Sequence, residues 1–175
     1  MNGQAMAAHL HRMAQEIVNG IPDPEELVIL GILRRGRPLA DRIARLIGQF
    51  TGVYPPVGSL ATTLYRDDPS RVATKPRGQT HFAFNLDDRT VLLVDDVLAA
   101  GRTIRAALDE VMDYGRPRRI QLACLVDRGS RELPIQPDYL GWAIGAPDDE
   151  WVSVRLQELD GEDAVLLERR QQNQP

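Results

Sequence analysis

Cysteine and histidine are scarce in this sequence, and long apolar runs are missing. Of the 175 residues, one is cysteine and three are histidine. One cysteine excludes a disulfide within the chain, and its place in the apolar run IQLACLVD predicts that Cys124 is a small core residue. His9, His11 and His81 join no Ser/His/Asp or Cys/His constellation, so we do not expect histidine catalysis.

The lack of long apolar runs has a consequence of its own. No run approaches the ~20 residues of a membrane-spanning helix. The N-terminus alternates apolar and polar residues, whereas a signal peptide has a basic flank and an apolar block. With 43% hydrophobic and 26% charged residues, the composition is that of a soluble globular protein. We therefore expect a cytoplasmic protein with one domain over residues 1–170 and a disordered tail at 171–175.

Short apolar runs and amphipathic stretches alternate along the chain, which favours an α/β fold with a mostly parallel sheet flanked by helices. A long polar stretch over 66–86 predicts a flexible flap or a projecting hairpin, and 128–139 reads as a turn-rich loop. The patterns predict helices over 6–18, 38–47 and 103–114, and strands over 27–33, 57–65, 90–95, 120–127, 151–157 and 164–168.

Three charged, glycine-containing loops follow predicted strands. They are RRGR at 34–37, DDVLAAGRT at 95–103 and DRGSRE at 127–132. In parallel sheets the ligand binds beyond the carboxyl ends of the strands. We therefore expect these loops to converge on one site.

The adjacent acids Asp95 and Asp96 are the first candidates for that site. Adjacent aspartates are often a solvated turn, but these precede the predicted helix by several residues, so its dipole would help them little. Two acceptor-only groups suit the vicinal hydroxyls of a sugar. A divalent cation, most plausibly Mg²⁺ held by substrate oxygens, fits beside them.

The segment from Ala99 to Thr103 is the second candidate. It reads either as an ordinary glycine turn or as a phosphate cradle, in which backbone N–H groups at a helix start and the Thr103 hydroxyl donate to the anion. The small residues let the backbone approach a phosphate closely. The strand and acid pair that precede it favour the cradle.

These blocks resemble a known family. VLLVDDVLAAGRT resembles the phosphoribosyl-pyrophosphate (PRPP) signature of type I phosphoribosyltransferases, and the chain is similar to the PyrR proteins, pyrimidine-operon regulators with uracil phosphoribosyltransferase activity. The matching pieces are TLYRDD, VLLVDDVLAAGRTIRAALD, YGRPRRIQLACLVDRGSRELPI and the weaker GILRRGRPLADRIA, in the family's order. LVDRGSRELPI is the most diagnostic of them.

The resemblance implies a role for each loop. Asp95 and Asp96 would hold the ribose hydroxyls and, through PRPP oxygens, Mg²⁺; Arg34, Arg35 and Gly36 would meet the pyrophosphate, with a cis non-proline peptide expected at Arg34–Arg35. Tyr65, Arg66 and Asp67 would begin the flap, and Arg128 and Ile144 would lie near the base. The implied catalytic residues are Arg35, Arg66, Asp67, Asp95 and Asp96, and the implied ligand-binding residues are Arg34, Arg35, Gly36, Asp95, Asp96, Val97, Leu98, Ala99, Ala100, Gly101, Arg102, Thr103, Arg128 and Ile144.

The implied reaction joins uracil to PRPP and gives UMP and pyrophosphate, with UMP and UTP as regulatory ligands and a homodimer or larger homo-oligomer as the assembly. The chain departs from the family at Ala99-Ala100, where Tyr-Thr is usual, which removes one hydroxyl donor to the phosphate. Ser130 stands where histidine is usual, Gln136 and Trp142 replace basic residues, and Gln15 stands where a histidine is common.

These departures bear on an RNA partner. Lys and Arg contacts to phosphates dominate affinity for RNA, so the loss of two cations in a chain of net charge −4 argues against binding to a pyrimidine-operon leader. Candidates for a remaining patch are Arg12, Arg116, Arg118, Arg119 and Arg131. Two alternatives stay open: a nucleotide-sensing regulator without turnover, acting through RNA or a protein partner, and a transferase for another base.

Overall fold

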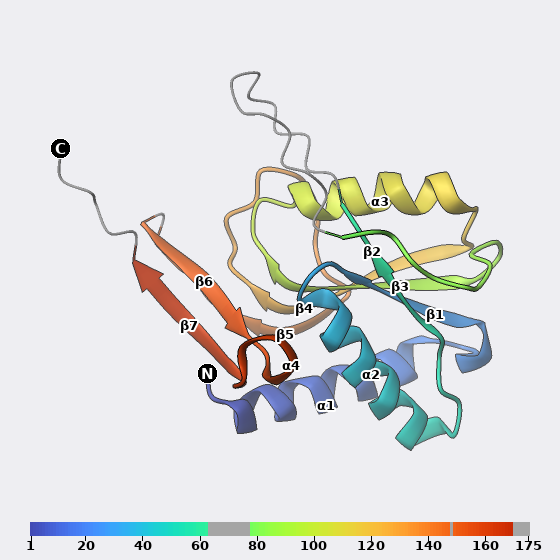
Figure 1. Cartoon of the computed structure of the whole chain (residues 1–175), viewed down its shortest axis with the longest axis horizontal. Coiled ribbons are helices and arrows are strands. Elements are labelled where there is room, and N and C mark those ends of the chain that lie inside the picture. The colour runs from blue at the N-terminus through green and yellow to red at the C-terminus, as the bar shows by residue number, and fades with distance from the viewer. Residues whose placement is uncertain (63–77, 148, 170–175) are drawn as a thin grey trace.

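A five-stranded parallel sheet forms the centre of the protein (Figure 1). The computed structural model describes residues 1–62, 78–147 and 149–169. The strands lie in the order β2-β1-β3-β4-β5. Their bounds are β1 Leu27–Ile32, β2 Val57–Leu60, β3 Thr90–Leu98, β4 Arg119–Asp127 and β5 Tyr139–Ala143.

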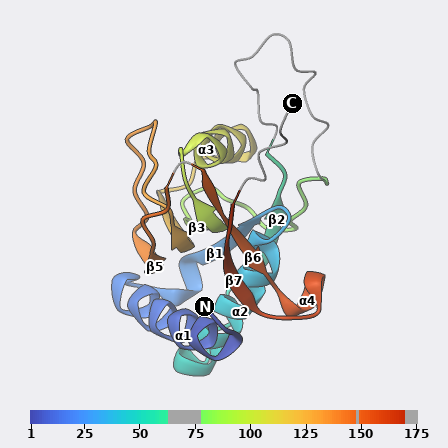
Figure 2. The same cartoon turned by 90° about the vertical axis from the view of Figure 1, so that its left-hand side faces the viewer.

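Helices cover both faces of this sheet. α1 (Gly3–Gly20) and α2 (Gly36–Thr51) lie on one face, and α3 (Arg102–Tyr114) lies on the other (Figures 1 and 2). A short 3-10 helix, η1 (Pro24–Glu26), precedes β1. No described helix is long and apolar enough to cross a bilayer.

Two apolar cores, one on each face, hold the layers together. Ile29 and Leu92 pack with α1 and α2, whereas Leu30 and Leu93 pack with α3. All six residues of β1 are buried, as expected of a strand covered on both faces. Each fully buried aliphatic side chain contributes ~1.5–3 kcal/mol to the free energy of unfolding. The central strands therefore form a rigid support for the loops that follow them.

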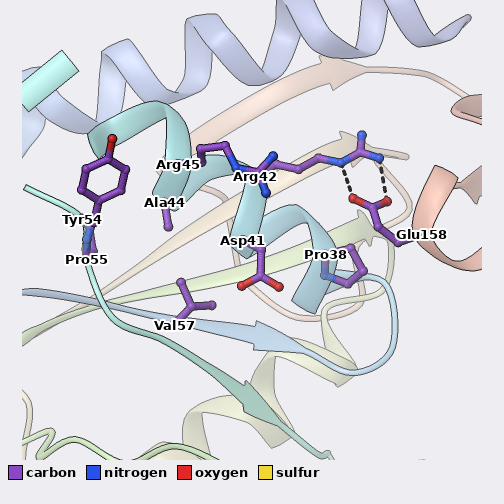
Figure 3. Close-up of a pocket in the computed structure, with 9 residues that line it drawn as sticks. All are labelled: Pro38, Asp41, Arg42, Ala44, Arg45, Tyr54, Pro55, Val57 and Glu158. Atoms are coloured by element: carbon purple, nitrogen blue, oxygen red, sulfur yellow. Dashed lines mark hydrogen bonds and ion pairs between the residues drawn. The ribbon is translucent and has the colours of Figure 1, made fainter. Parts of the chain in front are cut away.

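A separate antiparallel hairpin completes the fold at the C-terminal end. β6 (Glu150–Arg155) pairs with β7 (Ala164–Arg169), and the short helix α4 (Gln157–Asp160) lies in the connection between them. Val154 and Val165 bury the inner face of the hairpin in the α1/α2 core. The Arg42 guanidinium of α2 donates to Glu158 of α4, which ties the hairpin to the main body (Figure 3).

The α/β architecture with a parallel sheet is confirmed, and the differences concern boundaries. The second predicted helix begins two residues earlier than expected, at Gly36, and runs to Thr51, where Gly52 caps it in a left-handed conformation. The strand predicted over 90–95 continues to Leu98, while the one predicted over 57–65 is observed as Val57–Leu60, its last residues lying outside the described part. β5 was missed because its five residues follow a turn-rich segment and pair on one side only.

The predicted flap falls partly outside the described residues. Its described portion, 78–86, lies against the fold: His81 exchanges backbone hydrogen bonds with Ser59 at 2.8 and 2.9 Å, and Leu86 is fully buried. The predicted tail, 171–175, also lies outside the described residues.

Candidate active site

The strand order creates a switch point between β1 and β3. The chain leaves β1 through α2 toward β2 on one side, and leaves β3 through α3 toward β4 on the other side. In parallel sheets a ligand crevice forms where neighbouring strands send their connections in opposite directions. The carboxyl ends of β1 and β3 therefore mark the expected site, and the predicted loops at 34–37 and 95–103 meet there.

Two helices begin at this crevice, and neither has a side-chain cap. The N-cap of α2 is Arg35, in a right-handed helical conformation, and the N-cap of α3 is Gly101, with φ +91°. By contrast, the Asn2 side chain caps α1 by accepting from Ala5 N–H. Uncapped first turns leave backbone N–H groups available, and the helix dipole favours an anion there. The crevice thus has two positions suited to phosphate groups.

Asp95 and Asp96 lie between those two helix starts. They belong to β3, whereas the sequence predicted a strand end at Asp95. The alternation of side chains breaks at these acids, because Val94 and Val97 both pack in the α1/α2 core while Leu98 packs on the α3 side. Asp95 is buried, and its Oδ1 accepts the Asp96 N–H at 3.0 Å. The extended strand fixes the backbone of both acids.

Burial makes both carboxylates costly to ionise. Burial, and next the negative charge of Asp96, raises the pKa of Asp95 well above its ordinary value. Burial also raises the pKa of Asp96, although the Asp95 carboxyl and then the Arg35 guanidinium act in the opposite direction. Hydrogen bonds donated by sugar hydroxyls, or the positive charge of a cation, would offset this cost.

The loop after β1 lies tightly against β3. A Cβ atom at Gly36 would overlap the carbonyl oxygen of Val94, so only glycine permits this approach. A cis non-proline peptide is present in the loop at Leu33–Arg34, and its predicted position, Arg34–Arg35, is one residue too late. Arg34 is exposed, whereas Arg35 is half-buried and its Nε is buried without a partner among the described residues.

The loop from Ala99 to Gly101 is braced by the next loop along the sheet edge. The Arg131 guanidinium donates to the oxygens of Ala99 and Ile135 and to the Asp127 carboxylate, at 2.6–2.9 Å. The N–H groups of Glu132 and Leu133 both donate to Ala100 O at 3.1 Å. Sequence reasoning missed this brace, because 128–139 was predicted as a loop, and an i,i+4 spacing brings side chains together only on a helix.

The remaining predicted ligand residues gather at the same edge. Val97 is half-buried, Leu98 is buried, and Thr103 is half-buried in the first turn of α3. Arg102 is exposed and pairs with Glu132 at 2.6 Å. Arg66 and Asp67, as well as Tyr65, lie outside the described residues.

Arg128 and Ile144 follow β4 and β5 and lie together. Arg128 N–H donates to Leu98 O at 2.9 Å, and Ile144 N–H donates to Asp127 O at 2.8 Å. The Arg128 guanidinium donates to Pro147 O at 3.0 Å, while its Nε is buried without a partner. Both residues therefore lie at the carboxyl edge of the sheet, on the β4 side of β3.

The arginines considered for RNA do not form one patch. Arg116, Arg118 and Arg119 lie at the start of β4, and Arg131 follows its end, so the nine-residue strand separates them by about 26 Å. Arg12 donates to the carbonyls of β5, and the side chains of Arg116 and Arg118 also donate to the protein itself. Most of these guanidinium groups already have protein partners.

The expectation that Cys124 is a small core residue is confirmed, and two of the histidines belong to α1. Cys124 is fully buried, and burial raises the pKa of its thiol well above the ordinary value. His11 is exposed and packs edge-on against Phe50, with ring centres 5.0 Å apart, and His9 is half-buried. None of these residues belongs to the crevice.

The donor set gives a test of Mg²⁺. Among the described residues, no three His, Cys, Asp or Glu side chains gather into a metal cage. The crevice instead offers one pair of adjacent carboxylates. That set fits a cation that takes most of its ligands from substrate oxygens and water, as Mg²⁺ usually does.

A pocket lies along α2, between this helix, Tyr54 and Val57 (Figure 3). Among its charged side chains, Asp41 pairs with Arg37 and Arg42 pairs with Glu158. It has no buried acid pair and lies away from the start of α3. It therefore does not compete with the crevice as a candidate site.

Comparison with known proteins gives the family that the sequence motifs resemble, over nearly the whole chain. A family described as "Phosphoribosyl transferase domain" matches residues 1–155. The "Bifunctional protein PyrR" of Thermus thermophilus is 49% identical over 172 residues, covering 98% of this chain and 95% of the relative. The protein of the same name from Deinococcus radiodurans is 52% identical over 159 residues, covering 90% and 87%.

Solved structures share the fold at low identity. The hypoxanthine phosphoribosyltransferase of Trypanosoma cruzi, in a ternary substrate complex, matches with a TM-score of 0.74 and 17% identity, covering 97% of this chain and 93% of that one. A hypoxanthine-guanine phosphoribosyltransferase from Bacillus anthracis matches with a TM-score of 0.71 and 16% identity, covering 95% and 93%. These similarities show the type I phosphoribosyltransferase fold.

Proposed function

The chain belongs to the PyrR proteins of the phosphoribosyltransferase family, and from that premise we propose that it converts uracil and PRPP to UMP and pyrophosphate and regulates pyrimidine biosynthesis genes in response to nucleotides. One observation carries the catalytic part: an adjacent pair of carboxylates, Asp95 buried and Asp96 half-buried, lies between two uncapped helix starts at the β1/β3 switch point. A diol flanked by two phosphate groups matches that arrangement, and PRPP is such a molecule.

The proposed placement of PRPP follows the donors and acceptors. The ribose hydroxyls donate to Asp95 and Asp96. The 5′-phosphate accepts from the backbone of 99–103 at the start of α3, and the pyrophosphate accepts from Arg35 and from the start of α2. The orphaned Nε atoms of Arg35 and Arg128 support the placement of polar ligand groups beside them. Uracil then lies between Arg128 and Ile144.

The proposed reaction needs no protein nucleophile. A uracil ring nitrogen forms a bond to the anomeric carbon, the bond to pyrophosphate breaks with its electron pair leaving on oxygen, and the nitrogen proton passes to solvent or a basic group. The side chains align the reactants and stabilise the charge that develops. Mg²⁺, when bound with PRPP beside Asp95 and Asp96, supplies positive charge to the leaving group. Arg66 and Asp67 remain proposed catalytic residues of the flap.

The assay is the formation of UMP from uracil and PRPP with and without Mg²⁺. We expect turnover that requires Mg²⁺ and is lost in the Asp95→Asn/Asp96→Asn double variant. Turnover equal to wild type in that variant would contradict the proposed site. Clear UMP binding without turnover in the wild type would instead favour a nucleotide-sensing regulator on a transferase scaffold.

The regulatory partner needs a separate assay. A gel-shift titration with a pyrimidine-operon leader RNA at two salt concentrations measures whether binding has the salt dependence of phosphate contacts. Arg12, Arg118 and Arg131 already bind groups of the protein itself. If the assay shows no RNA binding, we propose a protein partner instead. We further propose that the protein is cytoplasmic, since the substrates are cytoplasmic metabolites. We also propose that it is a homodimer, and sedimentation measures the assembly.

A further inference from the structure

The connection of the C-terminal hairpin reaches the loop after β1. Arg35 Nη2 donates to both carboxylate oxygens of Asp160, at 3.0 and 3.3 Å, although 125 residues separate the two in sequence. Figure 1 shows α4, which ends at Asp160, beside the start of α2. The pair is partly shielded, with side chains 35% and 24% exposed. A residue outside every predicted motif therefore contacts the predicted pyrophosphate loop.

The structure holds Asp160 itself in place. Its Oδ2 accepts the Leu156 N–H, just before α4, at 2.9 Å. This backbone donor, followed by the charge of Arg35, lowers the pKa of Asp160, so the group stays ionised at neutral pH. The carboxylate is a fixed anchor for the guanidinium.

Arg35 stands between this anchor and the acid pair. Arg35 is followed by Gly36, which lies against the Val94 carbonyl one residue before Asp95, and the charge of Arg35 acts to lower the pKa of Asp96. Nη2 is bound to Asp160, whereas Nε is buried without a partner. Arginine binds an anion best when its planar fork is fixed before the anion arrives. One end of this fork is fixed, and the other keeps a donor for a ligand.

We propose that Asp160 is a positioning residue for pyrophosphate recognition, which orients the Arg35 guanidinium toward the pyrophosphate group of PRPP. The inference rests on the proposed function and deepens it. The C-terminal hairpin thereby sets the affinity of the crevice for the leaving group. UMP, which has no pyrophosphate group, does not depend on this contact.

Asp163 offers a matched control in the same hairpin. Its Oδ1 accepts the Gln157 N–H at 2.8 Å, and its carboxylate pairs with Arg42 of α2 at 2.8 Å. Its side chain is 25% exposed. Asp160 and Asp163 thus each accept one backbone N–H at the start of α4, from Leu156 and Gln157 respectively, and each has an arginine partner and similar exposure. They differ in which arginine they hold.

The experiment compares Asp160→Asn with Asp163→Asn. Asparagine keeps an acceptor for the backbone N–H and removes the charge. We expect Asp160→Asn to raise the Kd for inorganic pyrophosphate and the KM for PRPP about fivefold, the scale of a partly exposed ion pair. The Kd for UMP should stay as in the wild type, and Asp163→Asn should leave all three constants unchanged.

Each other outcome overturns the proposal. Equal effects of the two variants would mean that the hairpin matters only for stability. Tighter pyrophosphate binding in Asp160→Asn would mean that Asp160 competes with the ligand, and weaker UMP binding in that variant would mean a general disturbance of the crevice. Absence of turnover in the wild type would contradict the proposed function alone, because the pyrophosphate titration still tests Asp160.

Discussion

At the scale of single residues, the ligand role proposed for Asp95 and Asp96 comes at the expense of the stability of the free protein. Burying an ionised carboxylate is costly unless its oxygens have partners, and here the two charges also repel each other. Functional sites often keep such groups because selection acts on activity and only requires stability above a threshold. Asp95 is the clearer case, since it is the more deeply buried of the two.

The substitution Asp95→Asn should raise the stability of the ligand-free protein. Burial raises the pKa of Asp95 above its ordinary value of 3.8, so the folded chain binds this proton more tightly than the unfolded chain does. The free energy of unfolding therefore falls as pH rises from the unfolded-state pKa through the raised folded pKa. Asparagine keeps the acceptor for Asp96 N–H but does not ionise. We therefore expect the free energy of unfolding of Asp95→Asn to exceed that of the wild type by about 1 kcal/mol at pH 8.

Urea unfolding of wild type and Asp95→Asn between pH 4 and pH 8 measures this difference. The difference in free energy of unfolding between the variant and the wild type should increase with rising pH and approach zero toward pH 4. Asp109→Asn is the control, because Asp109 is an exposed acid of α3 whose nearest cation, Arg105, lies 3.6 Å away. A lower stability of Asp95→Asn at pH 8 would contradict the prediction.

At the scale of elements, the loop after β4 supports the loop after β3. Arg131 contributes three hydrogen bonds to this contact and is itself largely buried, with 21% of its side chain exposed. It was a candidate for RNA contact in the sequence, but its guanidinium faces the carbonyl of Ala99. The proposed phosphate loop therefore depends on a residue that need not touch the ligand.

Arg131→Ala should weaken UMP binding about tenfold and lower the free energy of unfolding by about 2 kcal/mol, since hydrogen bonds to charged groups contribute ~1.5–3 kcal/mol each. Titration calorimetry with UMP and urea unfolding measure the two effects. Arg105→Ala is the matched control, because Arg105 lies on α3 and pairs only loosely with Asp109. UMP affinity that is unchanged in Arg131→Ala would show that the loop keeps its shape without the brace.

The elements also show what a sequence can predict here. The strands β1, β3 and β4 were predictable because their apolar runs are continuous, and the acids and glycine turn of 95–103 are local in sequence. β5 depends on pairing with β4, and the position of the cis peptide depends on how the loop after β1 meets β3. The Arg35–Asp160 contact joins residues far apart in sequence, so no local sequence pattern predicts it.

At the scale of the whole molecule, the sheet order brings separate parts of the chain to one crevice. Loops from β1, β3 and β4 meet there because the strands are parallel and adjacent. A ligand that binds all three loops binds the folded state and not the unfolded chain. Its binding free energy therefore adds to the stability of the entire domain.

Thermal unfolding with nucleotides tests this coupling and the base preference together. At a hundredfold excess over its Kd, UMP should stabilise the fold by about 2.7 kcal/mol, a rise in Tm of about 5 to 10 °C for a domain of this size. The Asp95→Asn/Asp96→Asn double variant should lose most of this rise, because its crevice no longer accepts hydrogen bonds from the ribose as carboxylates do. An equal rise with GMP or IMP would mean a transferase for another base, and an undiminished rise in the double variant would mean that the nucleotide binds elsewhere.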